Sequence, residues 1–345
     1  MQHVAIDLGS SKSQVCVRNA DGSVAWERSI NTKDLVGRLQ KMERSRVVME
    51  TCAESFRIAD GALAAGHEVR VVPATLVRQL GVGDRGIKTD RRDAQALSSA
   101  SCRIDLPSVH LRSEQARERL TRIGVRQGLV EARTKLINTV RGWMRSQLRN
   151  VRCNTEHFGE QVREALLTEP EGVPDFIDGM LTCIKTLSEQ ISKQTDAIRT
   201  LTEQDEVCKR LMTVPGVGPI TSMTFVGVID DVSRFKKAEQ LESYLGLTPG
   251  ERSSSKRVRR TGITKAGSAM ARHVLTQAAL TLRRVRRDDP LTQWAEGIKQ
   301  RRGAQVATIA VARKLAGIMF AMWRDKTSYN PNLAATKPNK DDVMA

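Results

Sequence analysis

Aromatic residues and paired cysteines are scarce in this chain of 345 residues. Phe, Trp and Tyr make up only 3% of it, so base stacking on aromatic side chains is not expected to dominate any nucleic-acid binding. The cysteines are scattered, with no C-x-x-C and no nearby histidine pair; they are Cys16, Cys52, Cys102, Cys153, Cys183 and Cys208. This spacing argues against a zinc site or a disulfide framework and indicates reduced thiols in a cytoplasmic protein.

Long apolar runs and an excess of acid are also missing. No uninterrupted run of about 18 apolar residues occurs, and the N-terminus has no apolar signal segment. We therefore expect neither a membrane span nor a secretory signal. Lys and Arg number 56 against 39 Asp and Glu, a net charge of +17. This charge predicts a polyanionic partner, with nucleic acid first and an anionic membrane second.

Residues 1–105 have the pattern of an α/β domain. Three short β-rich runs, "HVAIDL", "SQVCVRN" and "SVAWERSI", are divided by turn signals. A helix "TKDLVGRLQKM", a strand "RVVMET", a helix "ESFRIADGALAAG" and a strand "EVRVVP" follow. Three hairpin-like strands followed by this alternation predict an RNase H-like fold.

Residues 106–205 read as two long helices. From residue 175 onward apolar residues alternate in steps of three and four, which is a heptad pattern. We expect an antiparallel helical hairpin or coiled coil, formed within one chain or between protomers. Ordinary core packing in a bundle explains the same pattern.

Residues 206–326 read as a mostly helical domain, and residues 327–345 as a flexible tail. "LMTVPGVGPITSMTFVGVI" resembles a helix–hairpin–helix, in which Gly216 and Gly218 would let backbone N–H groups approach a phosphate. A simple turn between helices is the alternative. We expect one helix over 232–247, a polar basic loop in "TPGERSSSKRVRRTG", a helix from residue 263 and a buried helix near the C-terminus.

Four carboxylates in the first domain form a candidate metal site. Asp7 follows an apolar strand, Glu50 ends another, and Asp90 and Asp93 are three residues apart on one predicted helix face. In an RNase H-like fold these segments converge at one edge of the sheet. Hard oxygen ligands predict Mg²⁺ or Mn²⁺, and a pair of such ions suits phosphodiester chemistry. Glu54 competes with Glu50 for its role, and each acid alone could be a turn residue, a cap or a solvated partner of arginine.

The sequence resembles the DEDD (RuvC-like) insertion-sequence transposases related to the Piv DNA invertase, the insertion-sequence family numbered one hundred and ten, nearer its eleven-eleven branch. The resemblance covers nearly the whole chain. It rests on "AIDLGSSK", "VVMETC" and "IKTDRRDAQAL" in the first block, and on "VPGVGPITSMTFVGVI", "RFKKAEQLESYLGLTPGERSSSK" and "GITKAGSAMARHVLTQAA" in the second.

The resemblance assigns the metal tetrad to Asp7, Glu50, Asp90 and Asp93, and it implies a serine nucleophile in "GLTPGERSSSK". Ser254 falls on that serine. Ser255 stands where glycine is usual, so Ser253 and Ser255 remain alternatives for the register. The cations near the serine could hold a scissile phosphate; they are Arg252, Lys256, Arg257, Arg259, Arg260 and, further on, Lys265. The plain alternative is a basic loop with incidental serines.

The resemblance further implies a recombinase that excises and inserts its own element in a bacterial cytoplasm, in association with the nucleoid. It implies donor and target DNA, a structured noncoding guide RNA, and a homodimer that assembles to a tetramer with sites shared between protomers. The basic helices between residues 112 and 150 are candidates for holding the RNA.

Three other functions fit parts of the sequence. A RuvC-type structure-selective nuclease would explain the four acids without needing the serine segment. A sugar-kinase or actin-like phosphotransferase would explain "IDLGSSKSQV", but no second Asp-Gly phosphate loop follows residue 104. A non-catalytic nucleic-acid scaffold leaves the acids unexplained in so basic a protein.

Overall fold

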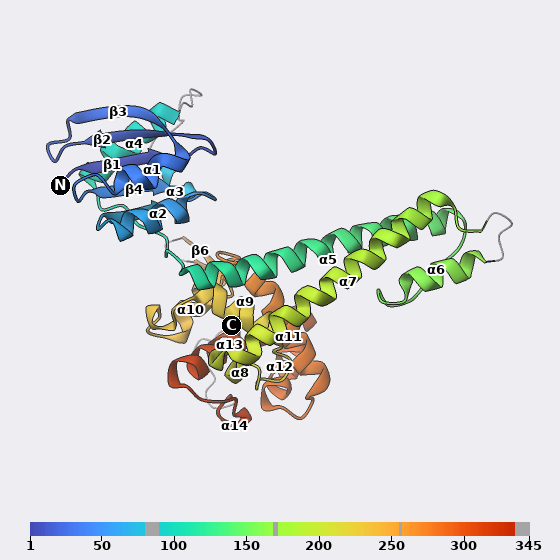
Figure 1. Ribbon diagram of the computed structural model, residues 1–345. Coiled ribbons are helices and arrows are strands. Elements are labelled where there is room, and N and C mark those ends of the chain that lie inside the picture. Colours follow the sequence, from blue (N-terminus) through green and yellow to red (C-terminus); the bar gives the residue numbers. More distant parts are fainter. Residues whose placement is uncertain (80–89, 168–171, 255–256, 335–345) are drawn as a thin grey trace. The chain divides into compact units, whose positions relative to one another are not determined.

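The chain folds as two units, Met1–Arg112 and Ser113–Ala345 (Figure 1). The computed structural model describes residues 1–79, 90–167, 172–254 and 257–334. The first unit is a mixed α/β sheet with helices, and the second is mostly helical.

A five-stranded sheet forms the centre of the first unit. Its strands are β1 (His3–Asp7), β2 (Lys12–Arg18), β3 (Val24–Asn31), β4 (Arg46–Glu50) and β5 (Glu68–Val72). The order is β3-β2-β1-β4-β5, in which β1 is antiparallel to β2 and parallel to β4. β1 and β4 carry three consecutive buried apolar residues each, as expected for central strands covered on both faces.

Helices cover both faces of this sheet. They are η1 (Thr32–Asp34), α1 (Leu35–Leu39), α2 (Ser55–Ala64), α3 (Ala74–Gln79) and α4 (Asp90–Arg103). On one face Ile6 and Met49 pack with Leu35 of α1 and Ile58 of α2. On the other face, Ala5 of β1 packs in a second cluster with residues of β4 and α4. α4 therefore lies over the centre of the sheet.

The second unit begins with a helical hairpin within one chain. α5 (Glu114–Ser146) and α7 (Asp175–Gln204) run side by side, with α6 (Phe158–Leu166) beside their far end (Figure 1). Val140 of α5, Phe158 of α6 and Ile184 of α7 belong to one buried cluster. The heptad pattern is therefore satisfied by intrachain packing at this end.

The rest of the second unit is a helical core with one small hairpin. Its elements are α8 (Glu206–Leu211), α9 (Pro219–Ile229), η2 (Val232–Arg234), α10 (Ala238–Tyr244), β6 (Pro249–Ser254), β7 (Arg257–Ile263), α11 (Ala269–Val285), α12 (Pro290–Arg302), α13 (Ala304–Asp325) and α14 (Pro331–Ala334). Every described residue of α9 from Thr221 onward is buried. Asp205 caps α8 by accepting hydrogen bonds from the N–H groups of Val207 and Cys208, at 2.9 and 2.8 Å.

One helix, α13, is long and apolar enough to cross a membrane, although we expected no such segment. Its apolar residues Val311, Leu315 and Met319 are completely buried in the helical core. Arg313, in the middle of α13, pairs with the buried Glu242 of α10 at 2.5 Å. These contacts identify α13 as a helix of the protein core, which explains its apolar composition.

The cysteines match the expectation of free thiols. All six are unpaired, and Cys208 is buried in the helical core. Burial raises the pKa of Cys208 to about 12, and the Asp205 carboxylate beside it adds to the shift. This thiol therefore stays protonated at neutral pH and is a poor nucleophile.

Three secondary-structure expectations in the second unit were wrong, and the first two concern residues 232–247 and the serine segment. Residues 232–247 do not form one helix, because Phe235 is extended and buried in the core between η2 and α10. The segment "TPGERSSSKRVRRTG" is not an irregular loop: its backbone forms the β6–β7 hairpin. Hydrogen bonds between strands join backbone groups, so a polar and basic sequence can also form a two-stranded ribbon.

A helix beginning at residue 263 was also expected, but α11 starts only at Ala269 and is capped by Ser268. Gly267 has a φ of +73°, and a Cβ there would lie 2.1 Å from the carbonyl oxygen of Tyr244. This close backbone approach holds the base of the β6–β7 hairpin against the end of α10 and delays the helix.

Candidate functional site

Asp7 and Glu50 end two neighbouring parallel strands. The register pairs Ile6 of β1 with Met49 of β4, so the two acids are the next residues on adjacent strands. Because side chains alternate along a strand, Asp7 shares its face with Ala5, and Glu50 shares its face with Val48. Ala5 and Val48 both pack in the cluster formed with α4. Both acids therefore lie at the strand ends on the face that α4 covers, and both are half-buried.

Asp93 lies on the face of α4 that packs on the sheet. Leu97 and Ala100, four and seven residues further along, belong to the cluster that includes Ala5, and this spacing places all three on one helix face. The side chain of Asp93 is buried, with only 8% of the residue exposed. A buried carboxylate at this position is costly without compensating interactions.

Contacts along α4 show that Asp93 is level with Asp7. Nδ1 of His3, at the start of β1, lies 2.8 Å from Oγ of Ser101. Ser98 donates to Cys16 at 3.2 Å, and Cys16 is the β2 partner of Ala5. α4 therefore runs opposite to β1. From Ser101 back to Asp93, eight residues of helix span about 12 Å. From His3 to Asp7, four residues of strand span about 13 Å. Because the two lengths nearly agree, Asp93 lies level with Asp7.

Glu27 of β3 holds the first turns of α4 onto the sheet. Its carboxylate accepts hydrogen bonds from Gln95 Nε2 at 2.9 Å and Arg91 Nε at 3.0 Å, both on α4. It also accepts one at 3.3 Å from Nε2 of Gln14, the β2 residue paired with Asp7. This residue was not among the sequence-based candidates, because one acid within a strand has no pattern of its own. The strand pairing alone reveals it.

The acids on this edge suit a hard cation. The structure brings Asp7, Glu50 and Asp93 into one layer between sheet and helix, and Asp90 begins the same helix. Carboxylate oxygens are what Mg²⁺ prefers. Within the described side chains, which do not include that of Asp90, no three potential ligands are close enough to hold an ion. Glu54, the competitor of Glu50, sits at the N-cap position of α2, where negative charge favours the helix.

The predicted nucleophile lies at the end of β6. Ser254 is the last residue of β6 and pairs with Arg257, while Ser253 pairs with Val258. Arg252 pairs with Arg259, and this register places the Arg252, Ser254, Arg257 and Arg259 positions on one face of the ribbon. Ser255 and Lys256 lie outside the described residues. Arg260 pairs with Glu251, and the exposed Lys265 follows the hairpin with a φ of +56°.

The two glycines of the predicted phosphate turn differ in their surroundings. Gly216, between α8 and α9, has a φ of +89°, and a Cβ there would lie 2.6 Å from the carbonyl oxygen of Ala278 in α11. Tight packing against α11 is therefore sufficient reason for this glycine. Gly218 caps α9, and a Cβ at this position would meet nothing within 4 Å, so its surroundings leave room for a ligand.

Comparison with known proteins gives matches in both units. Residues 4–147 match the DEDD_Tnp_IS110 family, which is described as transposase, and residues 208–293 match the family described as transposase IS116/IS110/IS902. The first match includes Asp7, Glu50, Asp90 and Asp93, and the second includes the serine hairpin and both glycines.

Curated relatives align over nearly the whole chain. The transposase for insertion sequence element IS1111A of Coxiella burnetii is 25% identical over 94% of this chain and 90% of the relative. The probable family 20 transposase of Pseudomonas aeruginosa is 28% identical over 96% of this chain and 99% of the relative. The transposase for insertion sequence element IS1328 of Yersinia enterocolitica is 25% identical over 95% of this chain and 98% of the relative. Both units of the chain are therefore similar to transposases of the IS116/IS110/IS902 family, and the relatives extend this similarity over nearly the whole chain.

Proposed function

We propose that this transposase is a site-specific DNA recombinase that excises and inserts its own element by attack of a serine on DNA. The observation that carries the proposal is the placement of Asp7 and Glu50 on adjacent strand ends, with Asp93 above them on α4. Such a layer of acids in a protein of net charge +17 is hard to explain without phosphodiester chemistry.

We assign the first unit to the RNase H-like class. Its strand order, with three antiparallel strands followed by two parallel ones, is the order expected of that class. On this assignment Asp7, Glu50, Asp90 and Asp93 would hold Mg²⁺ or Mn²⁺. Bound there, the metal would lower the pKa of an attacking hydroxyl and stabilise the leaving oxygen.

Ser254 is the proposed nucleophile. Its Oγ forms a bond to a DNA phosphorus as one P–O bond of the strand breaks, and the leaving strand takes up the proton that the serine loses. One phosphodiester is thus exchanged for another, so the strand can be rejoined without ATP. The register positions of Arg252, Arg257 and Arg259 on the Ser254 face would place positive charge beside that phosphate.

The remaining partners follow from the family resemblance. We propose donor and target DNA, a structured noncoding guide RNA, and a homodimer that assembles to a tetramer in the bacterial cytoplasm, associated with the nucleoid.

A suicide substrate nicked near the cleavage point tests the serine. Attack by Ser254 should trap the protein on DNA through a phosphoserine that survives denaturant and maps by mass spectrometry to the Arg252–Lys256 peptide. Ser254→Ala should lose the adduct and still bind DNA, because one hydroxyl adds little among many phosphate contacts.

The matched controls are Ser253→Ala and Ser255→Ala. Loss of the adduct in one of these instead would shift the register by one residue. Cleavage by water that persists in all three serine variants would identify a RuvC-type nuclease and overturn the recombinase proposal.

A further inference from the structure

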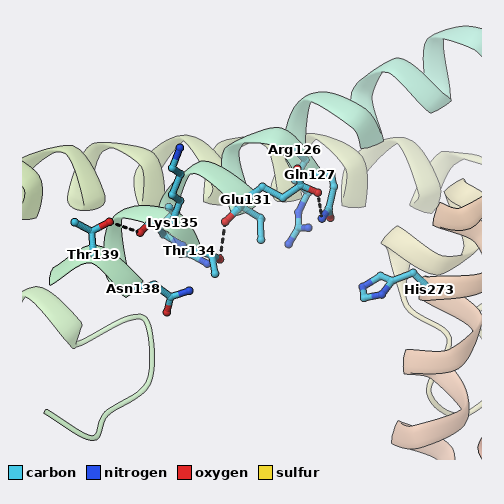
Figure 2. A pocket seen from close by; sticks show the side chains of 10 residues that line it. Arg126, Gln127, Glu131, Thr134, Lys135, Asn138, Thr139 and His273 are labelled. Atoms are coloured by element: carbon cyan, nitrogen blue, oxygen red, sulfur yellow. Dashed lines mark hydrogen bonds between the residues drawn. The ribbon is translucent and has the colours of Figure 1, made fainter. Parts of the chain in front are cut away.

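An open groove runs along α5 in the second unit and reaches α11. Its volume is about 890 Å³, and His273 faces α5 from α11 across it (Figure 2). The lining residues are Arg126, Gln127, Val130, Glu131, Arg133, Thr134, Lys135, Asn138, Thr139 and His273. No Phe, Trp or Tyr is among them, and His273 is the one aromatic ring in the lining, so base stacking is not expected to dominate binding in the groove.

The two arginines of the groove are held by hydroxyl groups. Arg126 donates from Nε to Thr195 Oγ1 at 2.8 Å, and Arg133 donates to Ser188 Oγ at 3.2 Å. Both hydroxyls lie on α7 and donate in turn to carbonyl oxygens of their own helix. They are thereby oriented as acceptors, which fixes the guanidinium groups at little cost.

These arginines keep their charge available. Nearer the start of α5, Arg119 pairs with Asp205 and Arg122 with Glu118. Within the described part of the chain, no ion pair joins Arg126 or Arg133 to a carboxylate. Burial lowers the pKa of Arg126, and the charge of Arg133 adds to this shift, so a bound anion would relieve an unfavourable environment.

We propose that this groove binds the phosphodiester backbone of the nucleic acid on which the recombinase acts, an inference that rests on the proposed function. Arg126 and Arg133 are two helical turns apart, about 10.5 Å, a length close to the rise of about three base pairs along the axis of a duplex. Glu131 is the one carboxylate in the lining, against three cationic side chains. An open, polar groove suits a backbone better than a small ligand, which is usually enclosed by apolar walls.

The position of α11 links the groove to the serine hairpin. Met270, in the first turn of α11, packs on the cluster of Ile123, Ile198 and Met223 and so anchors this turn beside α5. The β6–β7 hairpin ends at Ile263, five residues before the Ser268 cap. A strand lying in the groove would therefore pass close to the base of the hairpin that carries Ser254.

A pair of matched threonines tests the groove in the full-length protein. Thr134 lines it and Thr186 lies on α7 outside it; both are exposed and donate to the carbonyl oxygen four residues earlier. Thr134→Glu should weaken binding to a duplex DNA, to an RNA stem-loop or to both by roughly tenfold at low salt, because it puts a carboxylate beside the phosphates. Thr186→Glu should bind like the wild type.

A charge-loss pair gives an independent readout. Arg126→Gln with Arg133→Gln should reduce the slope of log affinity against log salt by about 2, the value for two phosphate contacts. Lys185→Gln with Lys193→Gln, on the exposed side of α7, should leave the slope unchanged. Loss with the DNA probe alone would assign the groove to DNA, loss with the RNA probe alone to RNA, and loss with both to a shared phosphate site.

Thr134→Glu binding both probes as tightly as Thr186→Glu would overturn the inference. The serine proposal is judged separately, by the trapped adduct. If the wild type forms the adduct and the groove variants bind nucleic acid normally, only the groove proposal fails. If the groove variants bind weakly and the wild type forms no adduct, only the serine proposal fails.

Discussion

At the scale of single residues, Asp93 gives the clearest prediction about metal binding. It is a buried acid on the α4 face that covers Asp7 and Glu50. Burying this carboxylate on the side of the sheet that also carries two other acids is unfavourable when they are ionised and no cation is present. The cost of gathering them is offset when a divalent ion binds.

Asp93→Asn should therefore weaken Mn²⁺ binding at least tenfold while keeping or raising the unfolding temperature without metal. Isothermal titration and thermal unfolding measure the two effects. Asp105→Asn is the control, because Asp105 is exposed and bonded only to Arg70 among its described contacts. Equal Mn²⁺ affinity in Asp93→Asn and the wild type would remove Asp93 from the tetrad.

At the scale of elements, the turn between α8 and α9 packs against α11, a structural role that its sequence did not predict. Gly216 was predicted as a phosphate contact, yet its backbone lies against α11 with no room for a side chain. The turn thus joins three helices of the core. Phosphate binding by Gly216 and Gly218 stays a prediction, and the surroundings favour it only at Gly218.

Gly216→Ala should destabilise the second unit by about 2–4 kcal/mol, because it combines a positive φ with a backbone clash. Gly218→Ala, two residues away and with open space around it, should cost less than about 1 kcal/mol. Urea unfolding of the two variants checks the difference. Similar stabilities for both would mean that the α8–α9 turn can move away from α11.

At the scale of the whole molecule, the excess of positive charge sets the partner class. A family of DNA transposases is consistent with it, since phosphate neutralisation releases counterions and favours binding to DNA. Most of this excess lies in the second unit, because residues 1–112 carry 17 Lys and Arg against 13 Asp and Glu, whereas residues 113–345 carry 39 against 26. Total charge alone does not identify the binding face.

Replacing four hairpin cations should reduce the slope of log DNA affinity against log salt by up to about 3–4, because each phosphate contact contributes about 0.9 to this slope. The variant carries Lys256→Gln, Arg257→Gln, Arg259→Gln and Arg260→Gln. Its control has the same change of charge in exposed cations of other helices, Lys185→Gln, Lys193→Gln, Arg301→Gln and Arg302→Gln. Fluorescence anisotropy over a range of salt measures both, and equal slopes would place the main DNA contacts outside the hairpin.

Local sequence determined the elements whose patterns are strong. The central strands, α2 and the long helices α5 and α7 were all predictable, because apolar periodicity and turn residues act over a few neighbours. The same is true of the acids at the ends of β1 and β4, which interrupt or close apolar runs. The family could be read from the order of these motifs and was confirmed by the matches in both units.

Tertiary structure alone decided which residues meet. Glu27 became the anchor of α4 only because β3 pairs with β2 and brings it beneath Arg91 and Gln95. The close approach of Gly267 to Tyr244 shortened α11 and helped set the β6–β7 hairpin where a loop was expected. The groove between α5 and His273 likewise joins residues more than 130 positions apart. Such contacts depend on how whole elements pack, and local propensity contains no information about them.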